Sequence, residues 1–204
     1  MPADLAAMPL VAILRGVTPE RVVEIARALF DAGMRAIEVP LNSPEPFVSI
    51  RALTASLGAH CLCGAGTVLG VEDVRRVREA GGNLIVSPNV NPAVIAAARG
   101  LTVMPGFATA SEAFAAIDAG ATHLKLFPAS TYGAGHIKAL KAVLPRAVPV
   151  YAVGGIGAAA IAEWKKAGAD GFGFGSELFR PDYSVTEIAR RAKLLVEAFS
   201  AAGN

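Results

Sequence analysis

Apolar and polar positions along this chain follow two repeating patterns. Short apolar runs, bounded by glycine, proline or polar residues, are typical of buried strands. Longer stretches between them carry apolar residues at every third or fourth position, which is typical of helices that cover a sheet. The runs predict eight strands, at residues 10–14, 36–40, 61–67, 84–88, 101–105, 123–127, 148–153 and 170–175.

Helix start signals follow most of these strands. Thr18 and Pro19 open a helix that runs to Asp31 and stops at Gly33, because threonine favours the N-cap and proline the first helical position. The remaining signals predict helices that open at 42–44, cover 71–80, start at 91–92, begin near 109–111, end about 167 and cover 185–201. Strand and helix therefore alternate with short connections.

Such an alternation requires parallel strands with helices outside them. Eight units close most economically into a barrel, whereas a doubly wound open sheet, the competing fold, usually has fewer strands. We predict an α/β protein with one domain over residues 1–204, a single (β/α)8 TIM barrel. The residues before Leu10 are expected to form a short N-terminal helix or arm over the bottom of the barrel.

Composition narrows the class of protein. A chain of 204 residues with 53% hydrophobic content can bury one sizeable core, and its net charge of +2 is spread too evenly to indicate a nucleic-acid partner. No apolar run is long enough to span a membrane, and the N-terminus lacks a signal-peptide pattern. Cys61 and Cys63 share one face of a strand, where they are badly placed for a disulfide. We expect a cytoplasmic protein with reduced cysteines and no membrane partner.

A lysine interrupts the apolar pattern of the sixth strand. Leu124 and Leu126 alternate with Lys125, so that if both leucines face the helices the lysine points into the barrel. Burial lowers the pKa of an ammonium group and makes a neutral, nucleophilic amine available. The alternative is a lysine that reaches solvent or pairs with an acid.

Glu38 interrupts the second strand in the same way, between Ile37 and Val39. The second and sixth strands lie on opposite walls of an eight-stranded ring, so Glu38 and Lys125 would meet across the lumen. A carboxylate facing an amine can move protons for it. A buried salt bridge to Lys125 or Arg15 is the alternative, but such a pair is costly to bury for stability alone.

Other strand ends carry groups suited to anion binding, because the C-terminal ends of barrel strands hold the active site. Arg15 offers a guanidinium that matches a carboxylate, although it could instead pair with Glu38. Thr67 follows small residues that would let a bound keto acid approach, or that only relieve crowding at the top of the barrel. Gly154, Gly155 and the segment ending at Ser176 expose backbone N–H groups where many barrels bind phosphate, with tight turns as the alternative.

Metal and hydrolase sites have no support in the residues. The three histidines are scattered, Glu38 is the one inward carboxylate, and no G-x-S-x-G is present. We therefore predict no metal and no cofactor. An inward lysine, one carboxylate, an anion clamp and a phosphate cradle indicate Schiff-base chemistry on a phosphorylated keto compound.

Five motifs, in order along the chain, resemble the KDPG/KDPGal aldolases. They are Ile13–Gly16, Glu38–Pro44, Gly64–Leu69, Lys125–Ser130 and Val153–Ile156. The resemblance covers nearly the whole chain. It implies a homotrimer of barrels with a Schiff-base lysine at Lys125 and an acid/base glutamate at Glu38. The remaining substrate-binding residues would be Arg15, Thr67, Phe127, Gly154, Gly155 and Ser176.

Within that family, the residues at two positions make this chain resemble the galactonate branch. The gluconate branch typically carries an arginine where this chain has Asn42 and a threonine where it has Val153. The resemblance thus implies cleavage of 2-dehydro-3-deoxy-6-phospho-D-galactonate to pyruvate and D-glyceraldehyde 3-phosphate. The gluconate epimer, 4-hydroxy-2-oxoglutarate and a sugar-phosphate barrel that is not an aldolase stay open as alternatives.

Overall fold

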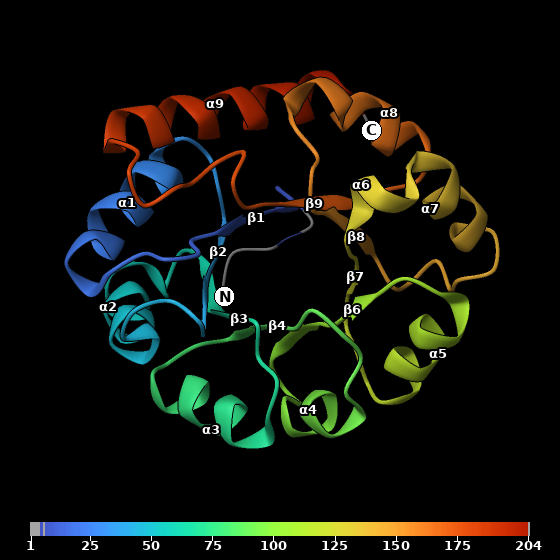
Figure 1. The fold of residues 1–204 in the computed structure, drawn as a ribbon, viewed down its shortest axis with the longest axis horizontal. Helices are drawn as coiled ribbons and strands as arrows, with labels where there is room; N and C mark the ends of the chain where they lie inside the picture. The colour runs from blue at the N-terminus through green and yellow to red at the C-terminus, as the bar shows by residue number, and fades with distance from the viewer. Residues whose placement is uncertain (1–4, 6, 204) are drawn as a thin grey trace.

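Parallel strands form a barrel at the centre of the computed structural model, which describes residue 5 and residues 7–203, and helices surround it (Figure 1). The strands are β1 Leu10–Ile13, β2 Ala36–Pro40, β3 Leu62–Gly66, β4 Leu84–Val86, β5 Thr102–Met104, β6 Gly106–Phe107, β7 Leu124–Leu126, β8 Val150–Val153 and β9 Gly171–Phe174. They pair in the order β5-β4-β3-β2-β1-β9-β8-β7-β6, and every pair is parallel.

The predicted fifth strand is divided in two by Pro105, and the ring closes through it. β5 pairs with β4, whereas β6 pairs with β7. Proline has no N–H to give to a ladder, which explains the break. The N–H of His123, just before β7, donates to the carbonyl of Val103 at 3.0 Å. The eight-stranded barrel predicted from the sequence is therefore confirmed, with its fifth strand counted as two.

Most helices match the predicted positions, but the helix expected to open at residues 42–44 begins at Pro46, where proline takes the first helical position, and the two helices after β7 were not predicted. They are α1 Pro19–Asp31, α2 Pro46–Leu57, α3 Val71–Glu79, α4 Pro92–Ala97, α5 Ala110–Asp118, α6 Ala129–Tyr132, α7 Ala134–Lys141, α8 Ile161–Lys166 and α9 Val185–Ala201, with a 3-10 turn η1 at Ala158–Ala160. No helix of the described chain is long and apolar enough to cross a bilayer. Thr109 caps α5 in a capping box with Glu112. Gly133, with φ of 77°, separates α6 from α7.

Two apolar clusters stabilise this arrangement. The larger one lies between the strands and the helices and includes Cys61 and Cys63, which are both buried and free. The smaller one fills the lumen with side chains such as Val11, Leu84 and Tyr151. Leu5 belongs to the lumen cluster, so part of the predicted N-terminal arm packs into the barrel, and residues 1–4 and 6 of that arm lie outside the described residues.

Candidate active site

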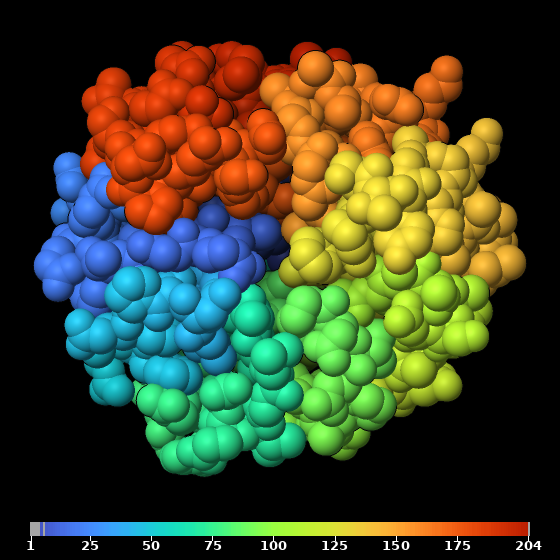
Figure 2. Space-filling view, in the orientation of Figure 1, coloured from blue at the N-terminus to red at the C-terminus, as the bar shows by residue number. Residues whose placement is uncertain are grey.

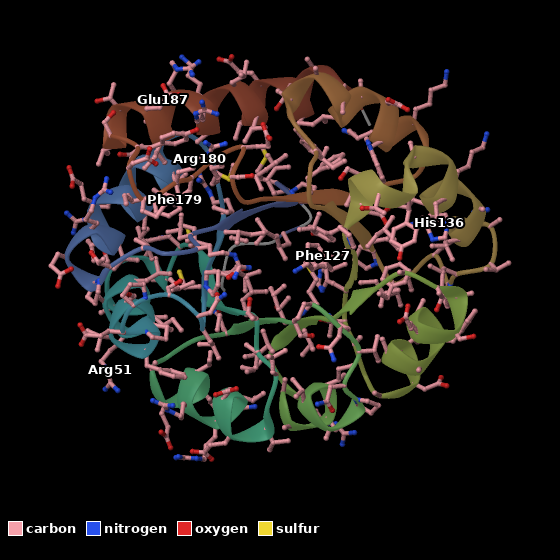
Figure 3. The ribbon with its side chains drawn as sticks, in the orientation of Figure 1. Arg51, Phe127, His136, Phe179, Arg180 and Glu187 are labelled. Carbon is pink, nitrogen blue, oxygen red and sulfur yellow. The ribbon has the colours of Figure 1, made fainter. Side chains whose placement is uncertain are left out.

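A cavity of about 220 Å³ opens at the C-terminal ends of the strands. In Figure 2 the face of the molecule is hollowed near its centre, and Figure 3 places Phe127 close to the same central region. All eight residues predicted for the site line this cavity, namely Arg15, Glu38, Thr67, Lys125, Phe127, Gly154, Gly155 and Ser176. The structure thus brings together residues that are far apart along the chain.

Lys125 lies in the middle of β7 with its side chain turned into the cavity. Its neighbours Leu124 and Leu126 pack in the larger apolar cluster, between the strands and the helices. Lys125 lies on the other face of the strand and therefore points into the lumen. The residue is only 6% exposed. Burial lowers the pKa of its ammonium group; the charge of Glu38 opposes this effect, and the charge of Arg15 adds to it. In the described part of the chain Lys125 forms no ion pair, so an amine that readily loses its proton faces the cavity.

Glu38 lies on β2, on the opposite wall. The strand register sets it beside Ile13 and Gly64, and the residue is 1% exposed. Burial raises the pKa of its carboxyl group to about 7, although the charges of Lys125 and Arg15 oppose the rise. One carboxylate oxygen, Oε2, is buried without a hydrogen-bond partner among the described residues. Glu38 can therefore take up and release a proton near neutral pH.

Arg15 binds partners other than Glu38. Its Nη1 donates to Oδ1 of Asn42 at 2.6 Å, and its Nη2 lies 3.4 Å from the Thr67 hydroxyl oxygen. The Gly16 N–H donates to the Ser43 hydroxyl at 3.0 Å. No Arg15–Glu38 ion pair occurs within the described residues. The guanidinium is held at the rim with donors left for an anion.

From the sequence, Asn42 and Ser43 were expected to open a helix, and Asn42 separated the two branches of the family, but neither residue was given a role in the site. Their hydrogen bonds show that the loop after β2 holds both the side chain of Arg15 and the backbone beside it. The signal was their position directly after a strand end, but that position does not say which neighbour they contact. Glu177 also lines the cavity and was not predicted there.

Two glycines at the end of β8 lie in the left-handed region of the backbone. Gly154 and Gly155 have φ of 98° and 73°, which disfavours any side chain. A Cβ on Gly155 would lie 2.4 Å from the Ser130 hydroxyl oxygen. The N–H groups of Gly155 and Ser176 donate to no backbone carbonyl in the described chain. These free donors form an edge of the cavity where an anion can bind.

Phe127 follows β7 and lies over the lysine. Its ring centroid is 4.6 Å from Lys125 Nζ, and the residue is 36% exposed. The ring also packs on Gly154, where an added Cβ would come within 3.3 Å of two ring carbons. Across the described residues, no three histidine, cysteine, aspartate or glutamate side chains are grouped so that they could hold a metal ion.

Comparison with known proteins agrees with this geometry. Residues 2–190 match the family model described as KDPG and KHG aldolase. The chain is 48% identical over 194 residues to the 2-dehydro-3-deoxy-6-phosphogalactonate aldolase of Escherichia coli K12, covering 94% of this chain and 95% of that one. It is 47% identical over 195 residues to a probable enzyme of the same name from Rhizobium meliloti, covering 95% and 92%.

A solved structure described as native KDPGal superimposes with a TM-score of 0.95 at 48% identity, and the match covers 96% of each chain. The similarity extends over the strands that carry the cavity, because so little of either chain lies outside it. The chain belongs to the KDPG and KHG aldolase family.

Proposed function

We propose that this protein is a class I aldolase that cleaves 2-dehydro-3-deoxy-6-phospho-D-galactonate to pyruvate and D-glyceraldehyde 3-phosphate. One observation carries the proposal: Lys125, buried and without an ion pair in the described chain, shares a cavity with Glu38, whose pKa is raised to about 7. A neutral amine and a carboxyl group that titrates near neutrality are the two groups that Schiff-base chemistry requires.

The first stage joins enzyme and substrate. The nitrogen of Lys125 attacks the C2 ketone to give a carbinolamine, and loss of water, with uptake of one proton, leaves a protonated imine. A solved Legionella pneumophila KDPG aldolase, 26% identical to this chain with a TM-score of 0.81, is described with pyruvate captured as a covalent carbinolamine. That relative supports the same stage here.

In the second stage the C3–C4 bond breaks. The Glu38 carboxylate takes the proton of the C4 hydroxyl, the aldehyde leaves, and the electron pair of the broken bond flows into the imine to form an enamine. The protonated Glu38 then returns a proton to C3. Water hydrolyses the resulting imine, so pyruvate and the free amine of Lys125 are restored.

The other cavity residues bind the substrate. Arg15 holds the carboxylate of the keto acid with help from Thr67, since its guanidinium keeps donors free beyond its bond to Asn42. Gly154, Gly155 and Ser176 hold the phosphate on backbone N–H groups. Phe127 closes the apolar side of the cavity above Lys125.

The galactonate epimer is proposed on two grounds. The two relatives that are 48% and 47% identical to this chain over 95% and 92% of their own length carry that name. Val153, which lines the cavity, also offers no hydroxyl to the part of the sugar where the two epimers differ. A site without that donor should not favour the gluconate epimer through it.

Two alternatives are distinguished by substrate and by covalent chemistry. A phosphogluconate aldolase of Treponema pallidum is 39% identical to this chain over 52% of it, and solved phosphogluconate aldolases that cover 92% to 98% of it are 26% to 28% identical. Barrels of other function, at 20% identity or less, share only the fold. A barrel enzyme that is not an aldolase would need only the positive charge of Lys125, so Lys125→Arg should retain its activity.

Borohydride trapping with pyruvate tests the proposal. The reduced adduct should add one 1-carboxyethyl group to the intact mass, and peptide mapping should place it on Lys125, with Lys125→Arg as the unmodified control. No adduct at that residue would refute the Schiff-base mechanism. A comparison of kcat/KM for the galactonate and gluconate epimers and for 4-hydroxy-2-oxoglutarate then identifies the substrate.

The proposal extends to the assembly and location of the enzyme. We propose a homotrimer of single-domain barrels in the cytoplasm that uses no cofactor and contacts neither nucleic acid nor membrane. A designed protein cage, built by fusing symmetric oligomeric domains, matches 95% of this chain at 48% identity, with 72% of the cage chain covered. This similarity supports an oligomer, and sedimentation velocity tests the number of subunits.

A further inference from the structure

The aromatic face of Phe127 is turned to the reactive nitrogen of Lys125. The ring centroid lies 4.6 Å from Nζ, within the range in which a cation is attracted to a ring face. Phe127 follows the lysine by two residues and lies near the centre of the barrel mouth (Figure 3). An aliphatic side chain of similar size would close the cavity equally well but would lack the electron-rich face.

The backbone around the ring holds it in this position. Gly154, at φ of 98°, leaves no Cβ to compete for the volume, and an added Cβ would come within 3.3 Å of the ring carbons Cδ2 and Cε2 and 3.4 Å of the Cα of Pro128. The ring is therefore packed between the end of β8 and the lysine.

Among the described residues, no charged group forms an ion pair with the Lys125 nitrogen. Glu38, on the opposite wall, and Arg15, at the rim, influence the lysine through their charges, and neither forms an ion pair with it. His123, on the same face of the chain, bonds to the Thr122 hydroxyl and meets Tyr151 edge-on. The Phe127 ring thus lies against a nitrogen that has no ion-pair partner within the described residues.

We propose that Phe127 is a catalytic residue whose ring face stabilises the positive charge on the Lys125 nitrogen in the protonated imine. This inference rests on the Schiff-base mechanism proposed above. When the amine bonds to C2 and water leaves, the nitrogen carries a positive charge in the protonated imine, and that charged form is the one that accepts the electron pair of the C3–C4 bond. The ring face lowers the free energy of that intermediate, whereas a purely apolar wall would raise it.

Graded fluorination of the ring separates these two roles. Phe127 is replaced, by site-specific incorporation, with 4-fluoro-, 3,5-difluoro- and 3,4,5-trifluorophenylalanine, which weaken the negative face of the ring in steps while its shape changes little. The measurement is the initial rate of borohydride trapping against pyruvate concentration. We expect the half-saturating pyruvate concentration to rise with each fluorine, by about two- to fivefold over the series. A flat or falling series overturns the inference.

Two further variants complete the test. Phe127→Leu retains an apolar wall without a ring face, so its half-saturating pyruvate concentration should also rise, and an unchanged value argues against the ring. Trifluorophenylalanine at Phe114, an exposed residue on α5, should leave trapping unchanged. If the unmodified enzyme gives no Lys125 adduct, the proposed function fails. If it gives the adduct and the fluorinated series is flat, only the role of Phe127 fails.

Discussion

The carboxylate of Glu38 fills the space that a side chain at Gly66 would need. A Cβ on Gly66 would lie 2.1 Å from Oε2 and 2.2 Å from Oε1 of Glu38. Gly66 ends β3, one strand away from β2. The absence of a side chain at residue 66 therefore sets where the proposed acid/base group can lie.

We predict that Gly66→Ala displaces the Glu38 carboxylate and lowers kcat about a hundredfold, because a shift of about 1 Å in a reacting group can cost that much. Steady-state kinetics on the phosphorylated keto acid measures the loss. Gly135→Ala is the matched control, since a Cβ there meets nothing within 4 Å. Near-normal kcat in Gly66→Ala would mean that the position of Glu38 is not critical.

The buried Glu38 should make stability depend on pH. Burial raises its pKa from 4.5 to about 7, so the folded protein holds this proton more tightly than the unfolded chain. The stability that this gives is complete below pH 4.5 and is lost as pH rises through 7. Glu38→Gln, which does not titrate, should therefore gain relative to the parent as pH rises, by roughly 1–3 kcal/mol at pH 8.

Urea unfolding of both proteins between pH 4 and pH 8 measures this difference in unfolding free energy. Glu187→Gln is a surface control. Hydrogen bonds to Arg190 and Arg191 lower the Glu187 pKa to about 2, so the stability of this variant relative to the parent should change with pH in the opposite direction. A Glu38→Gln difference that stays constant or shrinks as pH rises would contradict the raised pKa.

The rate of cleavage should fall in acid. Glu38 must be ionised to accept the C4 proton, and its pKa is about 7. Lys125 must be neutral to attack, and its pKa is lowered mainly by burial. We expect kcat/KM to rise between pH 5 and pH 8, with an inflection near 7 that is absent from the residual activity of Glu38→Gln. Stopped-time assays with coupled pyruvate detection record the profile, and a flat profile would count against Glu38 as the base.

Asn42 should act through Arg15. Its Oδ1 accepts from Arg15 Nη1 at 2.6 Å, and removing it frees the guanidinium to turn toward Glu38. Asn42→Ala should raise KM about five- to twentyfold with a smaller change in kcat, consistent with the loss of one charge-assisted hydrogen bond. Asn42→Asp keeps an acceptor and should restore much of the affinity. Equal KM values for the alanine variant and the parent would show that Asn42 does not contribute to substrate binding.

Gly155 should discriminate phosphorylated from unphosphorylated acids. Its φ is 73°, and an added Cβ would press on the Ser130 hydroxyl. Gly155→Ala should lower kcat/KM for the phosphorylated substrate at least about tenfold more than for 4-hydroxy-2-oxoglutarate, since the displaced N–H donors serve the phosphate. Gly120→Ala has a similar positive φ and open surroundings, so it controls for backbone strain. An equal loss on both acids would place the phosphate elsewhere.

Local periodicity was sufficient to predict the barrel and the two central groups. Because side chains alternate along a strand, Lys125 between Leu124 and Leu126, and Glu38 between Ile37 and Val39, had to face the lumen once those apolar neighbours met the helices. Parallel strands place their C-terminal ends at one end of a barrel, so Gly154, Gly155 and Ser176 could be assigned to the same cavity.

Contacts between distant segments could not be derived in this way. Whether Arg15 would pair with Glu38 or bind an anion was open on sequence grounds, and only the folded loop after β2 sets Asn42 against the guanidinium. The same holds for Gly66 beneath Glu38 and for Phe127 over Lys125. Residue order determines which face of a strand a side chain takes, whereas these distances depend on how β2, β3, β7 and β8 pack against one another.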